Sequence, residues 1–153
     1  MNQPQARERV ALGFDARSKS RLLLRLANGE HAALIVERGR LLRGGDRVVT
    51  EDGREIEIIA ADERLLEASS DDPLVLAKAA YHLGNRHVAV QILAGRLRFA
   101  DDHVLGEMVR GLGLEVAQVL APFDPEGGAY GHSHAHGSQV PLVRPKIHEF
   151  GAP

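Results

Sequence analysis

RLLEASSDDPLVLAKAAYHLGNRHVAVQILAGRLRFADDHVLGEMVRGLGLEVAQVL, residues 64–120, decides the fold, because two kinds of apolar pattern alternate along it. Short apolar runs typical of strands are RLLEAS, HVAVQIL, RLRFA and LEVAQVL, with a tight turn at Ala94-Gly95 between the middle two. One helical segment follows the first run and another precedes the last. The order βαββαβ predicts a ferredoxin-like fold for residues 63–122.

Both helices carry start signals. Asp72-Pro73 offers an acidic N-cap and a proline at the first helical position, and the helix is expected to end at Gly84 or Asn85. His87 is expected to open the next strand. For the second helix, Asp101 is the expected cap of a segment from residue 102 to about residue 112.

The sequence on either side of this segment has a different character. Residues 1–62 contain the short runs RVALGF, RLLLRL, HAALIV, DRVVT and EIEIIA, separated by Gly-containing turns, which predict a small antiparallel β-domain. Ten of the last 33 residues are Gly or Pro, against 13 of the preceding 120, so residues 123–153 are expected to form a flexible tail. The chain is therefore predicted to be an α+β protein with two domains and a tail.

Composition excludes several classes of protein. Nineteen Lys and Arg against 21 Asp and Glu give a net charge of −2, which argues against nucleic acid as a partner. The absence of Cys excludes disulfides, thiolate nucleophiles and Cys-ligated zinc. No apolar run is long enough to span a membrane, and the first 20 residues lack the apolar core of a signal peptide. We expect a cytoplasmic protein with no membrane partner.

The eight histidines point to metal binding. His132, His134 and His136 alternate in GHSHAHG, where an extended chain would hold neighbouring imidazoles on one side about 6.6 Å apart. The glycines allow this segment to bend, so two or three rings can meet at one ion. Neutral imidazole binds nickel, zinc and copper, and sequence alone does not choose among them. The alternative is a solvated tail that binds metal only in vitro.

Other histidines stand alone in the sequence. His103 lies in the first turn of the second helix, where Asp102 could orient it or simply favour the helix dipole. His82 and His87 lie at the end of the first helix, where a positively charged side chain interacts favourably with the helix dipole. His31 has no evident partner. His148 could extend the tail's ligand set. Catalytic motifs such as a nucleophile elbow, a P-loop or HExxH are absent, so no enzyme is expected.

Several of these motifs together resemble the UreE urease accessory proteins. They are AYHLGNRH from residue 80, LRF from 97, DHVL from 102 and PFDPEGGAY from 122, with FDARSKSR from 14 and LRGGD from 42. The resemblance covers the chain up to about His136.

This resemblance implies a homodimeric nickel metallochaperone that delivers nickel during assembly of the urease active site. Matching DHVL places the family's interface metal ligand on His103, shared between protomers across a two-fold axis. The tail residues His132, His134 and His136 would complete or supply that site. The resemblance also implies that the β-rich domain of residues 1–62 binds partners or peptides. The implied partners are the accessory GTPase UreG and the urease pre-activation complex.

Two departures from the family bear on metal capacity. Some relatives have a much longer His-rich tail, and some carry histidines on the last strand where this chain has Val116 to Val119. We therefore expect each dimer to bind only a few metal ions, which favours delivery of metal over its storage. Two alternatives stay open, a general nickel or zinc buffer and a protein-interaction module whose tail histidines are incidental.

Overall fold

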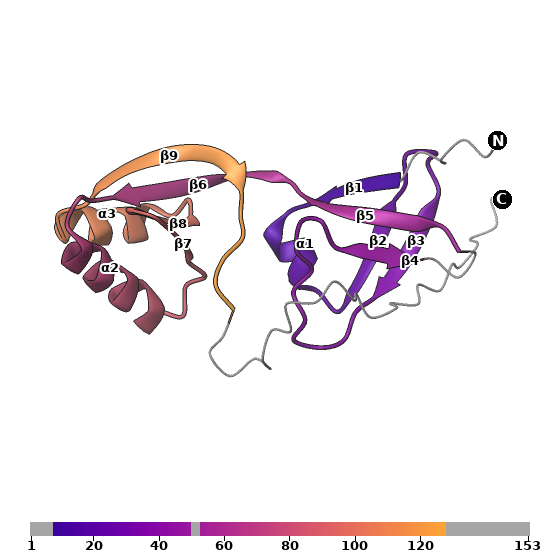
Figure 1. Cartoon of the computed structure of the whole chain (residues 1–153), viewed down its shortest axis with the longest axis horizontal. Helices are drawn as coiled ribbons and strands as arrows, with labels where there is room; N and C mark the ends of the chain where they lie inside the picture. The colour runs from indigo at the N-terminus through magenta and orange to yellow at the C-terminus, as the bar shows by residue number, and fades with distance from the viewer. Residues whose placement is uncertain (1–7, 50–52, 128–153) are drawn as a thin grey trace. The chain divides into compact units, whose positions relative to one another are not determined.

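The computed structural model describes residues 8–49 and 53–127 (Figure 1). These residues divide into two compact units, one that reaches Ala60 and one that starts at Ala61. Each unit has its own hydrophobic core, so each is described by itself. In this part of the chain, no helix is long and apolar enough to cross a membrane.

The first unit contains two small sheets. Its elements are β1 (Glu8–Leu12), α1 (Phe14–Ser18), β2 (Arg21–Arg25), β3 (His31–Ile35), β4 (Arg47–Val49) and β5 (Glu55–Ala60). Strands β2 and β3 form an antiparallel hairpin, and the other sheet has the order β1-β5-β4. Strands β4 and β5 are antiparallel, but β1 pairs with β5 in parallel. The predicted antiparallel domain is thus confirmed in two of its three strand pairs.

Alternate residues of these strands point into one core. It contains Val10, Leu24, Leu26, Ala32, Leu34, Val36, Leu42, Val48, Ile56 and Ile58. Beside this core Arg17 is fully buried at the end of α1, a short helix that the strand pattern does not predict. The Arg17 guanidinium donates hydrogen bonds to the carbonyls of Leu12 at 3.1 Å and Leu42 at 3.2 Å, so it connects the end of β1 to the segment between β3 and β4.

The second unit has the predicted ferredoxin-like order. It consists of β6 (Asp62–Ser69), α2 (Pro73–Asn85), β7 (Gln91–Leu93), β8 (Arg96–Ala100), α3 (His103–Gly111) and β9 (Glu115–Pro122). The sheet order is β7-β8-β6-β9, and every neighbouring pair is antiparallel. Both helices cover one face of this sheet (Figure 1). The α+β fold class expected from the sequence is confirmed.

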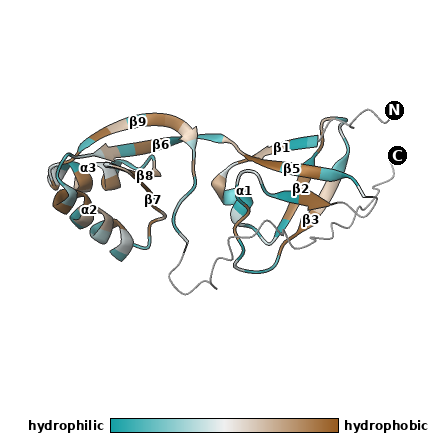
Figure 2. Cartoon of the chain, in the orientation of Figure 1, coloured by the Kyte–Doolittle hydropathy of each residue, from teal (hydrophilic) through white to brown (hydrophobic). Residues whose placement is uncertain are grey.

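The helices of this unit are amphipathic, with hydrophobic and hydrophilic residues interspersed along them (Figure 2). Ala79 and Leu83 of α2 and Leu105 and Val109 of α3 are buried. They pack with Phe99 and other apolar residues of the sheet in a second core, so burial of these side chains holds both helices on the sheet.

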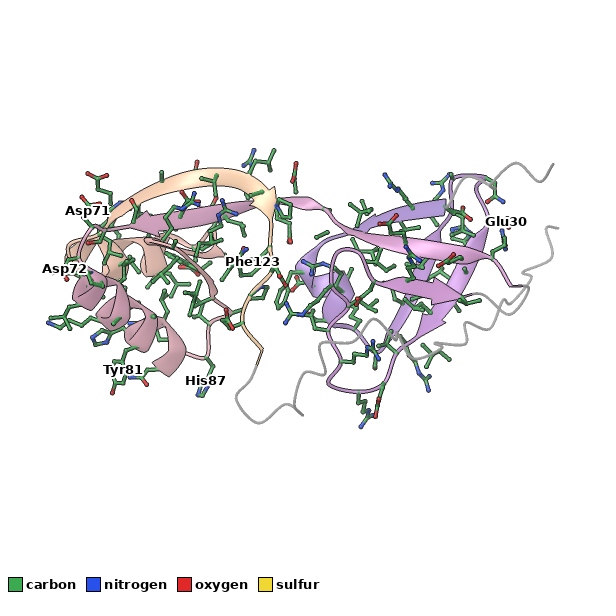
Figure 3. The ribbon with its side chains drawn as sticks, viewed as in Figure 1. Glu30, Asp71, Asp72, Tyr81, His87 and Phe123 are labelled. Carbon is green, nitrogen blue, oxygen red and sulfur yellow. The ribbon has the colours of Figure 1, made fainter. Side chains whose placement is uncertain are left out.

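The start of α2 matches the prediction, but its far end does not. The Asp72 carboxylate accepts a hydrogen bond from the Leu74 backbone N–H at 2.9 Å, and Pro73 is the first helical residue. After the helix, His87 has φ 55° and lies in the left-handed region instead of opening a strand. Figure 3 labels Asp72 and His87 at the two ends of α2. The next strand, β7, starts only at Gln91, because the preceding residues complete the end of the helix.

The predicted cap of α3 is wrong by one residue. Asp102, and not Asp101, is the N-cap, and its carboxylate accepts a hydrogen bond from the Leu105 N–H at 3.0 Å. Asp101 instead accepts hydrogen bonds from the Gln118 side-chain amide on β9, the shorter at 3.1 Å. The sequence offers two consecutive aspartates as caps. In the fold Asp102 caps the helix, while Asp101 contacts β9.

Candidate metal-binding site

His103 is the first residue of α3 and its side chain is exposed. The cap at Asp102 fixes where the helix begins, and buried Leu105 anchors the first turn against the sheet. The backbone around His103 is therefore held in place from both sides. Its imidazole projects from a rigid element, which suits a ligand that has to meet a metal ion in a defined geometry.

The carboxylates next to His103 are already engaged in structural contacts. Asp102 caps the helix through Leu105, and Asp101 binds Gln118. Within residues 8–49 and 53–127, neither makes a hydrogen bond to the His103 ring. Asp102 therefore acts as a helix cap, and the alternative that it orients His103 has no support in this structure. Both aspartates still add negative charge where a cation would bind.

Two large apolar side chains of this unit are exposed, one next to His103 in the sequence and one on β9. Val104, the next residue of α3, is 62% exposed. Leu120 is 68% exposed on β9, two residues after the Gln118 that binds Asp101. Large aliphatic side chains this accessible are candidates for burial against another protein surface.

The described residues do not form a complete metal site by themselves. They contain no group of three or more His, Asp or Glu that could hold an ion. Of the residues expected to bind metal, His103 is described, whereas His132, His134 and His136 lie outside the described residues, as does His148. A site with three or more His, Asp or Glu ligands at His103 therefore needs residues from outside the described ranges or from another chain.

The other described histidines stand apart from such a cluster. His82 is exposed in the last turn of α2, with its ring edge-on to Tyr81 at a centroid distance of 5.4 Å. His87 follows the same helix, and His31 is exposed on β3. None of them joins His103 in a group of ligands among the residues that the structure describes.

Sequence reasoning missed the contact between Gln118 and Asp101. This hydrogen bond connects the residue before the cap to β9 and so helps to fix the start of α3. The signal lies in the strand register, which sets Gln118 opposite Leu66 on the helix-covered face of the sheet. That register is not readable from Gln118 and its neighbours alone.

Both units match models of a known protein family. The model described as the UreE urease accessory protein, N-terminal domain, matches residues 2–61, and the corresponding C-terminal domain model matches residues 63–150. The chain belongs to the UreE urease accessory protein family. The resemblance seen in the sequence motifs is thereby confirmed.

Curated UreE proteins from three bacteria show how far the similarity extends. A protein named urease accessory protein UreE from Dechloromonas aromatica (strain RCB) is 51% identical, over 97% of this chain and 94% of its own length. Proteins of the same name from Pseudomonas putida (strain GB-1) and Citrobacter koseri are 53% and 52% identical, over 91% and 84% of this chain and 88% and 87% of their own lengths. These UreE relatives are named as accessory proteins and not as enzymes.

Proposed function

We propose that this UreE protein is a nickel-binding metallochaperone that delivers nickel during assembly of the urease active site. Membership of the UreE family supports a role in urease maturation. The observation that carries the nickel proposal is His103, an exposed imidazole on the capped first turn of α3. Nickel here is cargo, and the protein performs no reaction on it.

We place the nickel site between two copies of the chain. A two-fold axis beside α3 would bring His103 of each protomer to one ion, and the same contact would bury Val104 and Leu120. The proposed dimer explains why the described residues of one chain lack a complete site. His132, His134 and His136 are the proposed further ligands, because imidazole suits nickel and the chain offers no thiolate.

The same ligands favour release as well as capture. Imidazoles from an exposed helix end and a tail leave the ion accessible to a competing protein. Imidazole ligands also bind zinc and copper, so we expect both to compete with nickel in vitro. Because ligation requires neutral imidazole, nickel affinity should fall in acid. We propose the accessory GTPase UreG and the urease pre-activation complex as the receiving partners.

Urease activation at limiting nickel tests this proposal. Cells whose only UreE is the His103→Ala variant should yield urease activity near that of cells with no UreE, because the carrier cannot hold its cargo. Excess nickel in the medium should restore activity. The control is His82→Ala, which removes another exposed helical histidine of the same domain and should activate urease as the unmodified protein does.

Two results would contradict the proposal. If the His103→Ala variant activates urease fully at limiting nickel, the metal carried at this residue is not used for urease. If deletion of the whole protein leaves activation unchanged while cellular nickel content falls, the protein is a buffer and not a carrier.

A further inference from the structure

The outward face of the β2–β3 hairpin combines basic and aliphatic residues. Its six residues are Arg21, Leu23 and Arg25 of β2, and His31, Ala33 and Ile35 of β3. They share one face because side chains alternate along a strand and the register pairs Arg21 with Ile35, Leu23 with Ala33 and Arg25 with His31. We call these six residues the hairpin face.

Two large aliphatic side chains of the hairpin face are open to solvent. Leu23 is 62% exposed and Ile35 is 44% exposed, whereas Leu24 and Leu34, their neighbours on the opposite face, are 2% and 1% exposed. The inward side chains already fill the core of this unit. Stability of the unit therefore does not require Leu23 and Ile35 to be apolar.

The hairpin face also carries positive charge without a compensating carboxylate. Among the described residues, Arg21 and Arg25 have no ion pair, and the six positions include no Asp or Glu. The other sheet of the same unit differs, because there Arg9 pairs with Glu57 at 3.1 Å and Arg47 with Glu55 at 3.3 Å. Arginine beside exposed apolar groups is a typical composition of a protein-binding surface.

We propose that the hairpin face binds an acidic segment of a partner protein, with apolar side chains of that segment on Leu23 and Ile35. The guanidinium groups of Arg21 and Arg25 would each pair with a carboxylate of the partner, because the six residues of the hairpin face include none. The inference concerns the first unit alone. It holds whether or not His103 binds nickel.

The charge of the hairpin face favours one class of binding partner over the others. A second copy related by a two-fold axis would set arginine against arginine, which costs free energy. The chain's own residues 128–153 contain one carboxylate side chain, Glu149, against Arg144 and Lys146, so they are poorly matched to a basic face. The hairpin face has two arginines and no aromatic side chain. Surfaces for single-stranded nucleic acid usually add aromatic residues to a basic groove, and anionic membranes usually bind larger clusters of Lys and Arg. An acidic protein segment fits the local charge best.

The test uses the full chain and a fluorescein-labelled peptide with four Glu and two Leu in a Gly-Ser background, titrated by fluorescence anisotropy at low salt. Arg21→Glu with Arg25→Glu should weaken binding of this peptide by about tenfold or more, because attraction becomes repulsion. Leu23→Ser with Ile35→Ser should also weaken it. Circular dichroism checks that each variant folds.

A matched control separates the hairpin face from the overall charge. Arg64→Glu with Arg86→Glu makes the same change in net charge on exposed residues of the other unit and should leave the affinity unchanged. Equal weakening by this control, equal binding of a peptide with Lys in place of Glu, or no binding of the Glu peptide would each overturn the proposal. The proposal would also be overturned if the protein bound phosphatidylserine vesicles more tightly than the peptide and the Arg21→Glu/Arg25→Glu variant lost this binding. The hairpin face would then be a membrane-binding surface.

Discussion

Glu67 on β6 lies directly opposite Arg98 on β8, and its carboxylate accepts hydrogen bonds from Arg98 at 2.7 Å and Arg96 at 3.5 Å. The hydrogen bond from Arg98 is the main reason that the pKa of Glu67 is lowered from its ordinary 4.5, against the opposing effect of burial. The charge of Arg96 lowers the pKa further. The folded state therefore favours the ionised form of Glu67.

The sign of the resulting pH dependence follows from proton binding. Near and below pH 4.5 the unfolded chain binds a proton at Glu67 more readily than the folded chain does, so acid favours unfolding. The stabilisation is complete above this value and is lost as the pH falls through the folded-state pKa. Glu67→Gln should therefore lower the free energy of unfolding at pH 7 and flatten its decline in acid.

Urea unfolding followed by circular dichroism, at pH 7 and at about pH 3.5, measures this difference. Glu107→Gln is the control. The side chains of Arg110 and Glu107 are 47% and 59% exposed, so their ion pair should contribute little to the free energy of unfolding. Equal pH dependence in the Glu67→Gln variant and the unmodified protein would rule out this role for the pair.

The end of α2 shows how an element's boundary depends on backbone hydrogen bonds. The His87 N–H donates to the Gly84 carbonyl at 3.0 Å, and the Val88 N–H donates to the Leu83 carbonyl at 3.3 Å. This pattern is a Schellman motif, in which the residue at the position of His87 adopts a left-handed conformation and is usually glycine. His87, with φ 55°, is the only residue other than glycine with positive φ in the described part of the chain.

Replacement of His87 by glycine should therefore stabilise the protein. Glycine adopts this conformation without the Cβ clash, so the free energy of unfolding of His87→Gly should rise by about 1 kcal/mol. His82→Gly, inside the same helix, should instead lower it by about the same amount. Urea midpoints of the two variants measure the contrast, and destabilisation by His87→Gly would mean that the imidazole makes a contact worth more than the strain.

Most elements of the second unit could be predicted because their signals are local. The Asp72-Pro73 start of α2 and the alternating runs of β6, β8 and β9 depend on neighbouring residues alone. The parallel pairing of β1 with β5 joins strands more than 40 residues apart, and no local pattern encodes it. The choice of Asp102 over Asp101 as cap is likewise not readable from the local sequence, where the two aspartates are adjacent, and in the fold Asp101 contacts Gln118 of another element.

At the scale of the whole molecule, the proposed function depends on a metal site that two copies of the chain would form together. The described residues place one candidate ligand, His103, on a rigid helix start next to exposed Val104 and Leu120. The place of His103 in the first turn of α3 could be predicted from the sequence and is confirmed. Its role as a metal ligand rests on the resemblance of the DHVL motif and stays a prediction. Its partners in a metal site could not be derived from one chain, because a shared site depends on the symmetry of the assembly.

A calorimetric nickel titration of the unmodified protein beside His103→Ala tests this account most directly, with the oligomeric state measured by light scattering on the same samples. We predict one tight site for every two chains in the unmodified protein and loss of that site in His103→Ala, while His82→Ala titrates as the unmodified protein does. If His103→Ala binds nickel with unchanged stoichiometry and affinity, nickel is held without His103 and the shared site does not exist.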